Sequence, residues 1–208
     1  MSTLVLVRHA QSTTFENNSD RLSAAGEQQA ICLGQYWQAQ GVRFDEVYTG
    51  TMRRHIRTAE LAGFSEFTPK PDFNEYDAQG ILRANPQYAP AADNRQLQKQ
   101  FEKMMPLWVA DKLDAPGVES WPAFHERVRS ALQAIIDSEG PSRRTVVFTS
   151  GGPISVAVQT VLQAPEHVAI EVNWRIKNCS LTEFIFTRGR ISLDTFNATP
   201  HLREVTFR

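Results

Sequence analysis

An arginine and a histidine stand side by side directly after the first apolar run of the chain. Leu4–Val7 is continuously apolar, which is typical of a central strand covered on both faces, and Arg8 and His9 follow it at once. Sheets of α/β proteins place their ligand sites at this carboxyl edge of the strands. Neutral imidazole is a nucleophile and a guanidinium group binds phosphate. The pair therefore marks a candidate ligand site, although a dipeptide alone is equally compatible with an ordinary surface loop.

A second basic cluster opens the helix that we expect after the short strand Asp45–Thr49. It contains Arg53, Arg54 and Arg57, and helical N–H groups together with guanidinium groups can converge there on an anion. For Arg53 and Arg57, a solvated basic helix end is a plausible alternative. The cluster nevertheless supplies a second set of cations for a phosphate site.

Two further segments could complete such a site. The turn or short strand Phe73–Asp77 carries Glu75, a candidate general acid, with Asp77 next in line, although a solvated acidic loop is the simpler reading of this segment. Gly151 and Gly152 lie between an apolar strand and a helix, which would let the backbone approach a phosphate closely. A tight turn would require the two glycines equally.

The elements that must position these residues alternate between strand and helix patterns. Such alternation favours a three-layer α/β/α sandwich with a mostly parallel central sheet and right-handed crossovers. The C-terminal edge should be antiparallel, because two strand patterns are joined there by Arg188-Gly189 as a hairpin. The expected strands are Leu4–Val7, Asp45–Thr49, Thr145–Thr149, Leu181–Phe186 and Ile191–Phe196. The expected helices run from about 23 to 40, 52 to 62, 96 to 111, 122 to 138 and 150 to 162.

The length of 208 residues favours one domain over residues 1–208. The segment at about 76–120 is rich in proline and polar residues but contains an amphipathic helix over Gln96–Asp111. We interpret this segment as a cap or lid inserted into the single domain.

Composition excludes several classes of function. A formal net charge of -1 does not favour nucleic acid or a membrane surface as a partner. The opening apolar run is too short for a signal peptide or a membrane span, so a cytoplasmic location is expected. The two cysteines, Cys32 and Cys179, stand far apart and form no metal-binding pattern. No metal and no cofactor are expected.

In the same order along nearly the whole chain, these segments resemble the motifs of the histidine phosphatase superfamily, whose fold is that of phosphoglycerate mutase. The family's Arg-His-Gly opening is similar to Arg8–Ala10, and its Leu-Thr-x-x-Gly-x-x-Gln-Ala motif to Leu22–Ala30. The Arg-Ala-x-x-Thr-Ala, Leu-x-Glu and Gly-Glu-Ser motifs are similar to Arg54–Ala59, Phe73–Glu75 and Gly117–Ser120.

The resemblance implies a role for each matched residue. His9 would become phosphorylated, Arg8 and Arg54 would bind the phosphoryl oxygens, and Glu75 would protonate the leaving alcohol. Ser150, Gly151 and Gly152 would contact the substrate. The substrate would be a phosphorylated small molecule or a phosphoprotein.

The chain departs from the family pattern at the second active-site histidine. The family has Ser-His-Gly-Gly where this chain has Thr149–Gly152, so Ser150 stands in the histidine's place. Losing such a donor costs about 10²- to 10³-fold, by analogy with oxyanion holes. His55 follows Arg54 where the family has alanine, but neighbouring helical residues point about 100° apart, so we expect His55 to face away and Ser150 to act with the glycine amides. Phe15, near a polar phosphate contact of many relatives, suggests an apolar substrate group or a core residue.

Hydrolysis of a phosphomonoester or a phosphohistidine, with reduced or atypical activity, is therefore the leading hypothesis. A phosphate-binding pseudoenzyme with a regulatory or binding role is the alternative from a different class. Phosphoglycerate mutase activity is weaker, because no extra element for retaining and reorienting the substrate is evident. A serine hydrolase built on Ser150 lacks the glycine two residues before the serine that the G-x-S-x-G elbow requires.

Overall fold

A computed structural model of the chain describes residues 1–13, 20–138 and 142–207, so the interpretation of Phe15 lies outside the described residues. Within these ranges the strands form one six-stranded sheet of order β3-β2-β4-β1-β5-β6. The strands are β1 (Ser2–Arg8), β2 (Glu46–Thr49), β3 (Thr68–Pro69), β4 (Arg144–Thr149), β5 (Leu181–Thr187) and β6 (Arg190–Ala198). The helices are α1 (Ala24–Ala39), α2 (Arg53–Leu61), α3 (Ala78–Arg83), α4 (Asn94–Val109), α5 (Trp121–Asp137), α6 (Gly151–Val161) and α7 (His167–Asn173), with a 3₁₀ turn, η1, at Pro71–Phe73.

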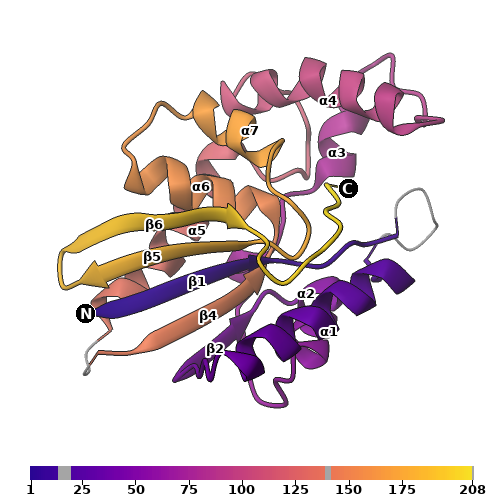
Figure 1. Cartoon of the computed structure of the whole chain (residues 1–208). Coiled ribbons are helices and arrows are strands. Elements are labelled where there is room, and N and C mark those ends of the chain that lie inside the picture. Colours follow the sequence, from indigo (N-terminus) through magenta and orange to yellow (C-terminus); the bar gives the residue numbers. More distant parts are fainter. Residues whose placement is uncertain (14–19, 139–141, 208) are drawn as a thin grey trace.

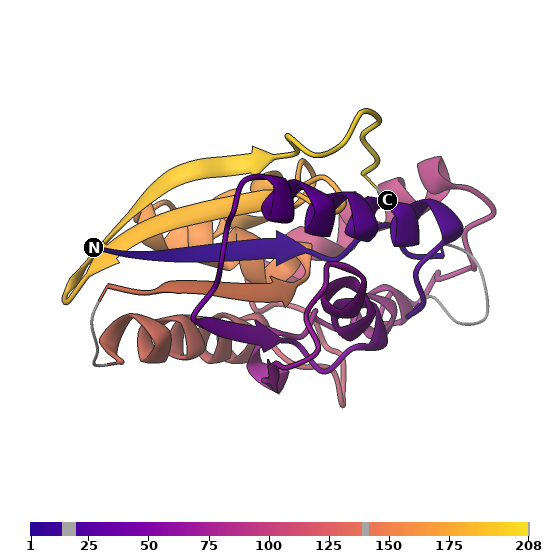
Figure 2. The same cartoon turned by 60° about the horizontal axis from the view of Figure 1, so that its bottom comes forward.

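The sheet is parallel in its first part and antiparallel at its C-terminal edge, as predicted. β4 pairs in parallel with both β1 and β2, whereas β5 pairs antiparallel with β1 and β6 antiparallel with β5. Figure 2 shows this order, with β6 at the top and β2 at the bottom. Because β1, β2 and β4 are parallel neighbours, the segments that follow them emerge at one edge of the sheet.

Alternating side chains of the central strands build two apolar layers. Val5 and Val7 of β1 pack with α1 and α2, whereas Leu4 and Leu6 pack with α5 and α6. Figure 1 shows α1 and α2 on one side of the sheet and α5 and α6 on the other. The three-layer α/β/α architecture is therefore confirmed, and its two cores hold the strand ends rigidly in place.

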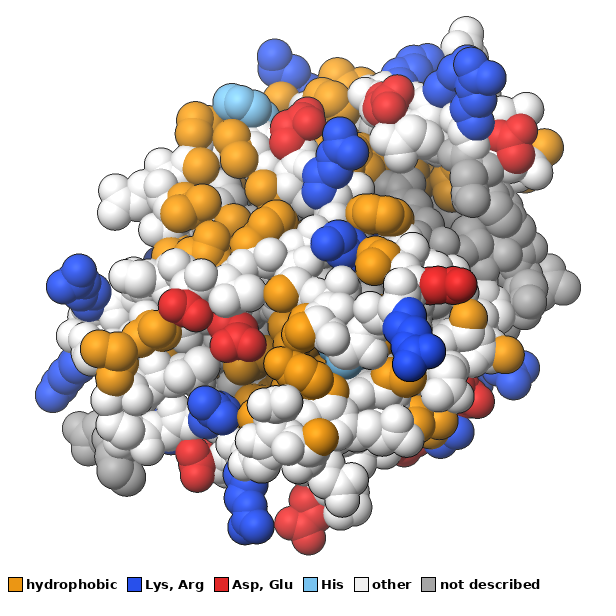
Figure 3. Space-filling view, viewed as in Figure 1, with side chains coloured by type: hydrophobic (Ala, Val, Ile, Leu, Met, Phe, Trp, Pro, Cys, Tyr) orange, Lys and Arg blue, Asp and Glu red, His pale blue; other side chains and the backbone are white. Residues whose placement is uncertain are grey.

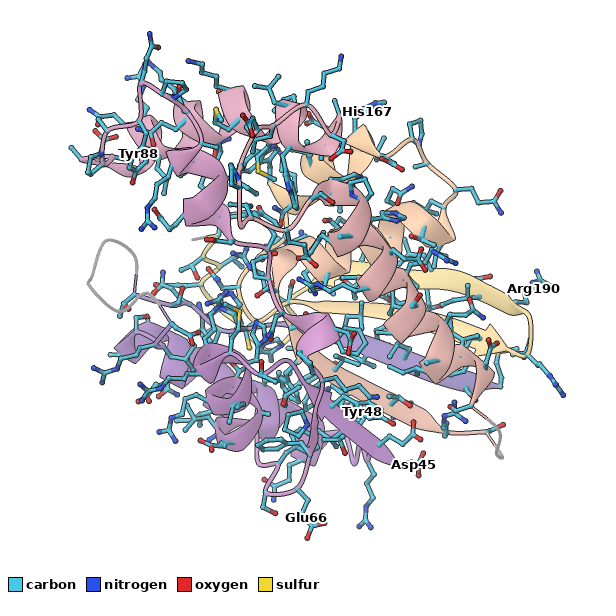
Figure 4. The ribbon with its side chains drawn as sticks, turned by 180° about the vertical axis from the view of Figure 1, so that it is seen from behind. Asp45, Tyr48, Glu66, Tyr88, His167 and Arg190 are labelled. Carbon is cyan, nitrogen blue, oxygen red and sulfur yellow. The ribbon has the colours of Figure 1, made fainter. Side chains whose placement is uncertain are left out.

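The segment at about 76–120 forms α3 and α4. Phe101, Met104, Met105 and Trp108 of α4 are buried in the same core as α5 and α6. In Figure 4, Tyr88, between α3 and α4, and His167, the first residue of α7, lie at the top, far from Asp45, which precedes β2. The interpretation of this segment as a lid stays a prediction.

Three short elements were not expected: β3, α3 and α7. Each is seven residues or shorter, too short for a hydrophobic period to stand out.

None of the described helices is long and apolar enough to cross a membrane. On the face shown in Figure 3, basic and acidic side chains are interspersed and neither sign forms a continuous patch.

Candidate active site

The candidate site lies where β1, β2 and β4 end. His9 follows β1, Gly50 follows β2 and Ser150 follows β4. Backbone hydrogen bonds continue the sheet into these segments: His9 N donates to Thr149 O at 2.8 Å, and Gly50 N donates to Phe148 O at 2.9 Å. The sheet itself therefore brings the predicted motifs together.

His9 is held with one ring nitrogen available for chemistry. Its Nδ1 lies 2.8 Å from the carbonyl oxygen of Ala10, and because a carbonyl can only accept, Nδ1 carries the proton and Nε2 carries the lone pair. Burial lowers the pKa of His9 well below 6.5, and the charges of Arg54 and Arg8 lower it further. His9 is therefore a neutral imidazole near pH 7.

Two motifs hold the segment after His9. The Ala10 N–H donates to Thr58 Oγ1 at 3.1 Å, and Thr58 Oγ1 donates to the Arg54 carbonyl at 2.6 Å. The Gln11 N–H donates to Gln29 Oε1 at 2.9 Å. The threonine and glutamine of the family motifs therefore position the backbone beside His9.

The two matched arginines lie near His9 but have different partners. Arg54 Nη1 pairs with Asp20 Oδ1 at 3.0 Å, and the side chain of Arg54 is only 12% exposed. Arg8 donates to the carbonyls of Ile176 and, at 3.0 Å, Phe207. The chain around Phe207 therefore lies beside the end of β1. The positive charges of both guanidinium groups lower the pKa of His9.

Glu75 is directed to the start of α6. Its Oε2 accepts from the Gly152 N–H at 3.2 Å, and its Oε1 accepts from the Tyr76 N–H at 3.2 Å. Burial raises the pKa of Glu75 above 4.5, although the charges of Arg54 and Arg8 and the Gly152 hydrogen bond oppose this shift. A Cβ atom on Gly152 would overlap Glu75 Oε1, so glycine is required for this approach.

Asp77, the second carboxylate considered as an acid, has a structural role instead. Its Oδ1 accepts from the Gly80 N–H at 2.9 Å and caps α3. Glu75 is therefore the carboxylate of the Phe73–Asp77 segment that reaches the site.

Arg127 and Asn74 hold the segment that carries Glu75, and the sequence did not single them out. Arg127 makes a bidentate pair with Glu119 at 2.7 and 2.9 Å and donates to the carbonyls of Asp72 at 2.7 Å and Asn74 at 3.1 Å. Asn74 Oδ1 accepts from Thr51 N at 2.7 Å. The Gly117–Ser120 motif was a signal for Glu119, but its partner on α5 follows only from the fold.

The expectation that His55 faces away from the site is wrong. His55 is fully buried, its Nε2 lies 2.7 Å from Ser150 Oγ, and its ring centroid lies 5.7 Å from that of His9. Arg54 and His55 both lie in the first turn of α2, where Cα–Cβ bonds tilt toward the helix N-terminus. Two side chains about 100° apart around the axis can therefore reach a site that lies beyond the helix end.

The glycines at the start of α6 are buried and lie beside the other site residues. Gly152 gives its N–H to Glu75, whereas a Cβ atom on Gly151 would overlap Asn173 Oδ1 and lie 3.9 Å from Arg8 Nε. The side chain of Ser150 caps no N–H group of α6. Within the described ranges, no cluster of histidine, cysteine or acidic side chains could hold a metal ion.

Comparison with known structures finds proteins of the same fold. The chain is similar in structure to a phosphoserine phosphatase mutant from Entamoeba histolytica in complex with phosphoserine, with a TM-score of 0.71 and 19% identity over 97% of this chain and 100% of that chain. It is also similar to a mycobacterial glucosyl-3-phosphoglycerate phosphatase in complex with VO3, with a TM-score of 0.68 and 22% identity over 95% of this chain and 100% of that chain.

A search of curated proteins gives no match. Residues 4–199, nearly the whole chain, match the family described as the histidine phosphatase superfamily, branch 1. The chain therefore belongs to the histidine phosphatase superfamily.

Proposed function

We propose that this protein hydrolyses a phosphomonoester through a phosphohistidine intermediate at His9. The observation that carries the proposal is the state of His9: its Nδ1–H is bound to Ala10 O, so Nε2 has an available lone pair. Two guanidinium groups beside it can offset the charge of a phosphoryl group. No metal is needed for this chemistry.

In the first step, Nε2 of His9 attacks phosphorus, and the N–P bond forms as the bond from phosphorus to the ester oxygen breaks. Glu75 gives its proton to the departing oxygen, so an alcohol leaves and Glu75 becomes a carboxylate. The raised pKa of Glu75 favours this role, because it keeps a larger fraction of the carboxyl protonated in the free protein. Arg8 and Arg54 stabilise the transferring phosphoryl group.

In the second step, water attacks phosphorus and the N–P bond breaks. The Glu75 carboxylate accepts a proton from the water, phosphate forms, and His9 returns to the neutral state. The starting protonation states of His9 and Glu75 are thereby restored. Over both steps, one ester and one water become one alcohol and one phosphate.

We further infer that Ser150 replaces the family's second active-site histidine. Two observations support this inference: Ser150 follows β4, where the resemblance to the family motif expects that histidine, and Ser150 Oγ lies 2.7 Å from His55 Nε2. A hydroxyl group can donate to a phosphoryl oxygen but lacks the charge of an imidazolium group, which favours reduced activity.

A small phosphomonoester is the favoured class of substrate, with a protein phosphohistidine as the second. The two structural relatives named above are described as phosphatases of phosphoserine and of glucosyl-3-phosphoglycerate, both small phosphomonoesters. Their likeness supports the reaction class and leaves the choice of substrate to experiment.

The test is steady-state hydrolysis of a panel of phosphomonoesters by the parent and by His9→Ala. We expect turnover by the parent, none above background by His9→Ala, and an acid-labile, base-stable phosphoenzyme in rapid-quench samples of the parent. His125→Ala is the matched control. His125 belongs to α5, and its Nε2 lies 2.8 Å from Oε1 of Gln159 on α6, outside the site.

Two results would replace this proposal. An acid-stable phosphoenzyme that persists in His9→Ala would indicate Ser150 as nucleophile. Absence of turnover, together with vanadate binding that Arg54→Ala abolishes, would indicate a phosphate-binding protein without catalysis.

A further inference from the structure

Two buried histidines from different elements lie next to each other at the candidate site. His9 follows β1, whereas His55 belongs to the first turn of α2. Their ring centroids are 5.7 Å apart and their planes are inclined by 31°. His55 Nε2 lies 2.7 Å from Ser150 Oγ, which follows β4. Ser150 and His55 thus form a hydrogen-bonded pair beside the nucleophile.

The structure provides room for this imidazole. A Cβ atom on Gly50 would overlap His55 Nδ1 and lie 2.9 Å from its Cε1. Glycine at this position is therefore needed for the ring to occupy its place. A polar ring buried against the end of a strand is costly unless its N–H group finds an acceptor.

The hydrogen bonds of His55 indicate where its proton lies. Among the described residues, Nδ1 has no hydrogen-bond partner, whereas Nε2 has Ser150 Oγ. A proton on Nδ1 would be a buried donor without an acceptor, so we place the proton on Nε2, where it is donated to the serine oxygen. Ser150 Oγ accepts from no N–H of α6, so this oxygen can accept from His55 Nε2–H, and the hydroxyl hydrogen of Ser150 can then be donated to another group.

We propose that His55 is a positioning residue that acts through Ser150: His55 Nε2–H donates to Ser150 Oγ, and the Ser150 hydroxyl donates to a phosphoryl oxygen. This inference rests on the proposed function. It explains two departures from the family pattern as one change, in which the second imidazole moves from the end of β4 to the start of α2. The contact that a histidine at position 150 would make is supplied by the Ser150–His55 pair.

The electrostatic surroundings are compatible with this arrangement. Burial lowers the pKa of His55 well below 6.5, and the charge of Arg54 lowers it further. His55 is therefore a neutral donor near pH 7. The positive charge at the phosphoryl group comes from Arg8 and Arg54 instead.

The decisive experiment exchanges the two side chains. We compare kcat and KM on p-nitrophenyl phosphate for the parent, His55→Ala, Ser150→Ala, the double alanine variant, and the exchange variant His55→Ala with Ser150→His. His55→Ala and Ser150→Ala should each lower kcat about 10²-fold, by analogy with a lost oxyanion donor, with little change in KM. The double alanine variant should be no worse than either single variant, because both residues form one hydrogen-bonded chain.

The exchange variant should recover at least about tenfold in kcat over His55→Ala, because it returns an imidazole to the end of β4. A purely structural loss at position 55 would not be rescued at position 150. Ser150→His alone should lower activity, since the new ring would collide with His55. His125→Ala should match the parent, and it controls for removal of a partly buried, hydrogen-bonded histidine outside the site.

The outcomes separate this inference from the proposed function. Unchanged kcat in His55→Ala, with His9→Ala inactive, would refute the role of His55 and leave His9 as nucleophile. A parent no faster than His9→Ala would refute both. If His55→Ala does not fold, His55→Gln takes its place: its side-chain amide can reproduce the Nε2–H donor, so kcat should stay within about tenfold of the parent, and a complete loss would refute the role.

Discussion

The Gly152→Ala substitution should disable the proton donor without touching the nucleophile. The added Cβ atom would lie 2.9 Å from two ring carbons of Tyr76 and closer still to Glu75 Oε1. Ordinary carbon–carbon contacts are about 3.5 to 4.0 Å, so the ring must move by about 0.6 to 1 Å and the carboxyl group by more. A misplacement of about 1 Å costs about 10²-fold in rate, which corresponds to about 2.7 kcal/mol of transition-state stabilisation.

The size of the loss should depend on the leaving group. Nitrophenolate needs little protonation, whereas an alkoxide needs a proton from Glu75 as it departs. We expect kcat/KM of Gly152→Ala to fall about 10²-fold on β-glycerophosphate and less than about fivefold on p-nitrophenyl phosphate. This ratio reports the first step, whereas kcat also contains hydrolysis of the phosphoenzyme, in which Glu75 acts as base for both substrates. Glu75→Gln should show the same selectivity with a larger loss. The measurement is steady-state kinetics on both substrates.

Gly41→Ala is the matched control for a destabilising glycine replacement. Gly41 has a φ of 63° and no atom close to its added Cβ, so the variant loses stability through backbone strain alone. It should melt at a lower temperature with kcat unchanged. Equal losses by Gly152→Ala on the two substrates would refute the assignment of Glu75 as the acid, as would parent-like kinetics of Gly152→Ala on β-glycerophosphate.

Two further predictions follow from the same site. The pH profile of kcat/KM should be bell-shaped with an acidic to neutral optimum. His9 must be neutral and its pKa lies well below 6.5, whereas Glu75 must be protonated and its pKa lies above 4.5. Glu75→Gln should remove the alkaline limb of the profile, and an alkaline limb that persists in this variant would contradict the assignment of Glu75 as the acid. Arg127→Lys should cost about 2 kcal/mol of stability, because lysine cannot hold Glu119 and the carbonyls of Asp72 and Asn74 at once. For a chain of 208 residues this loss lowers the melting temperature by about 4 to 8 °C, and displacement of Glu75 should lower kcat about tenfold. Arg129→Lys, which alters an exposed pair with Glu126 on the same helix, should change neither quantity, and equal effects of the two variants would refute the role of Arg127.

The local patterns of the sequence were sufficient to predict the strands and the longer helices. The apolar run Leu4–Val7 lies within β1, and the i+4 spacing of Phe124, Val128 and Leu132 places all three on the buried face of α5. The helix expected from about residue 23 is α1, and Ser23 caps it, with its side chain accepting from Gly26 N. These features depend on neighbouring residues along the chain, so the order of residues alone carries them.

The contacts between distant residues could be recognised only from the tertiary structure. Arg127 is 53 residues from the Asn74 carbonyl that it holds, and His55 is 95 residues from Ser150. The sequence reveals His55 as an unusual residue, but helical geometry alone gave the wrong direction for its side chain. Its position depends on the tilt of the first turn of α2 toward the strand ends and on the space left by Gly50. The sequence by itself therefore determined the elements and the residue types of the site, whereas long-range packing decided which of those side chains meet.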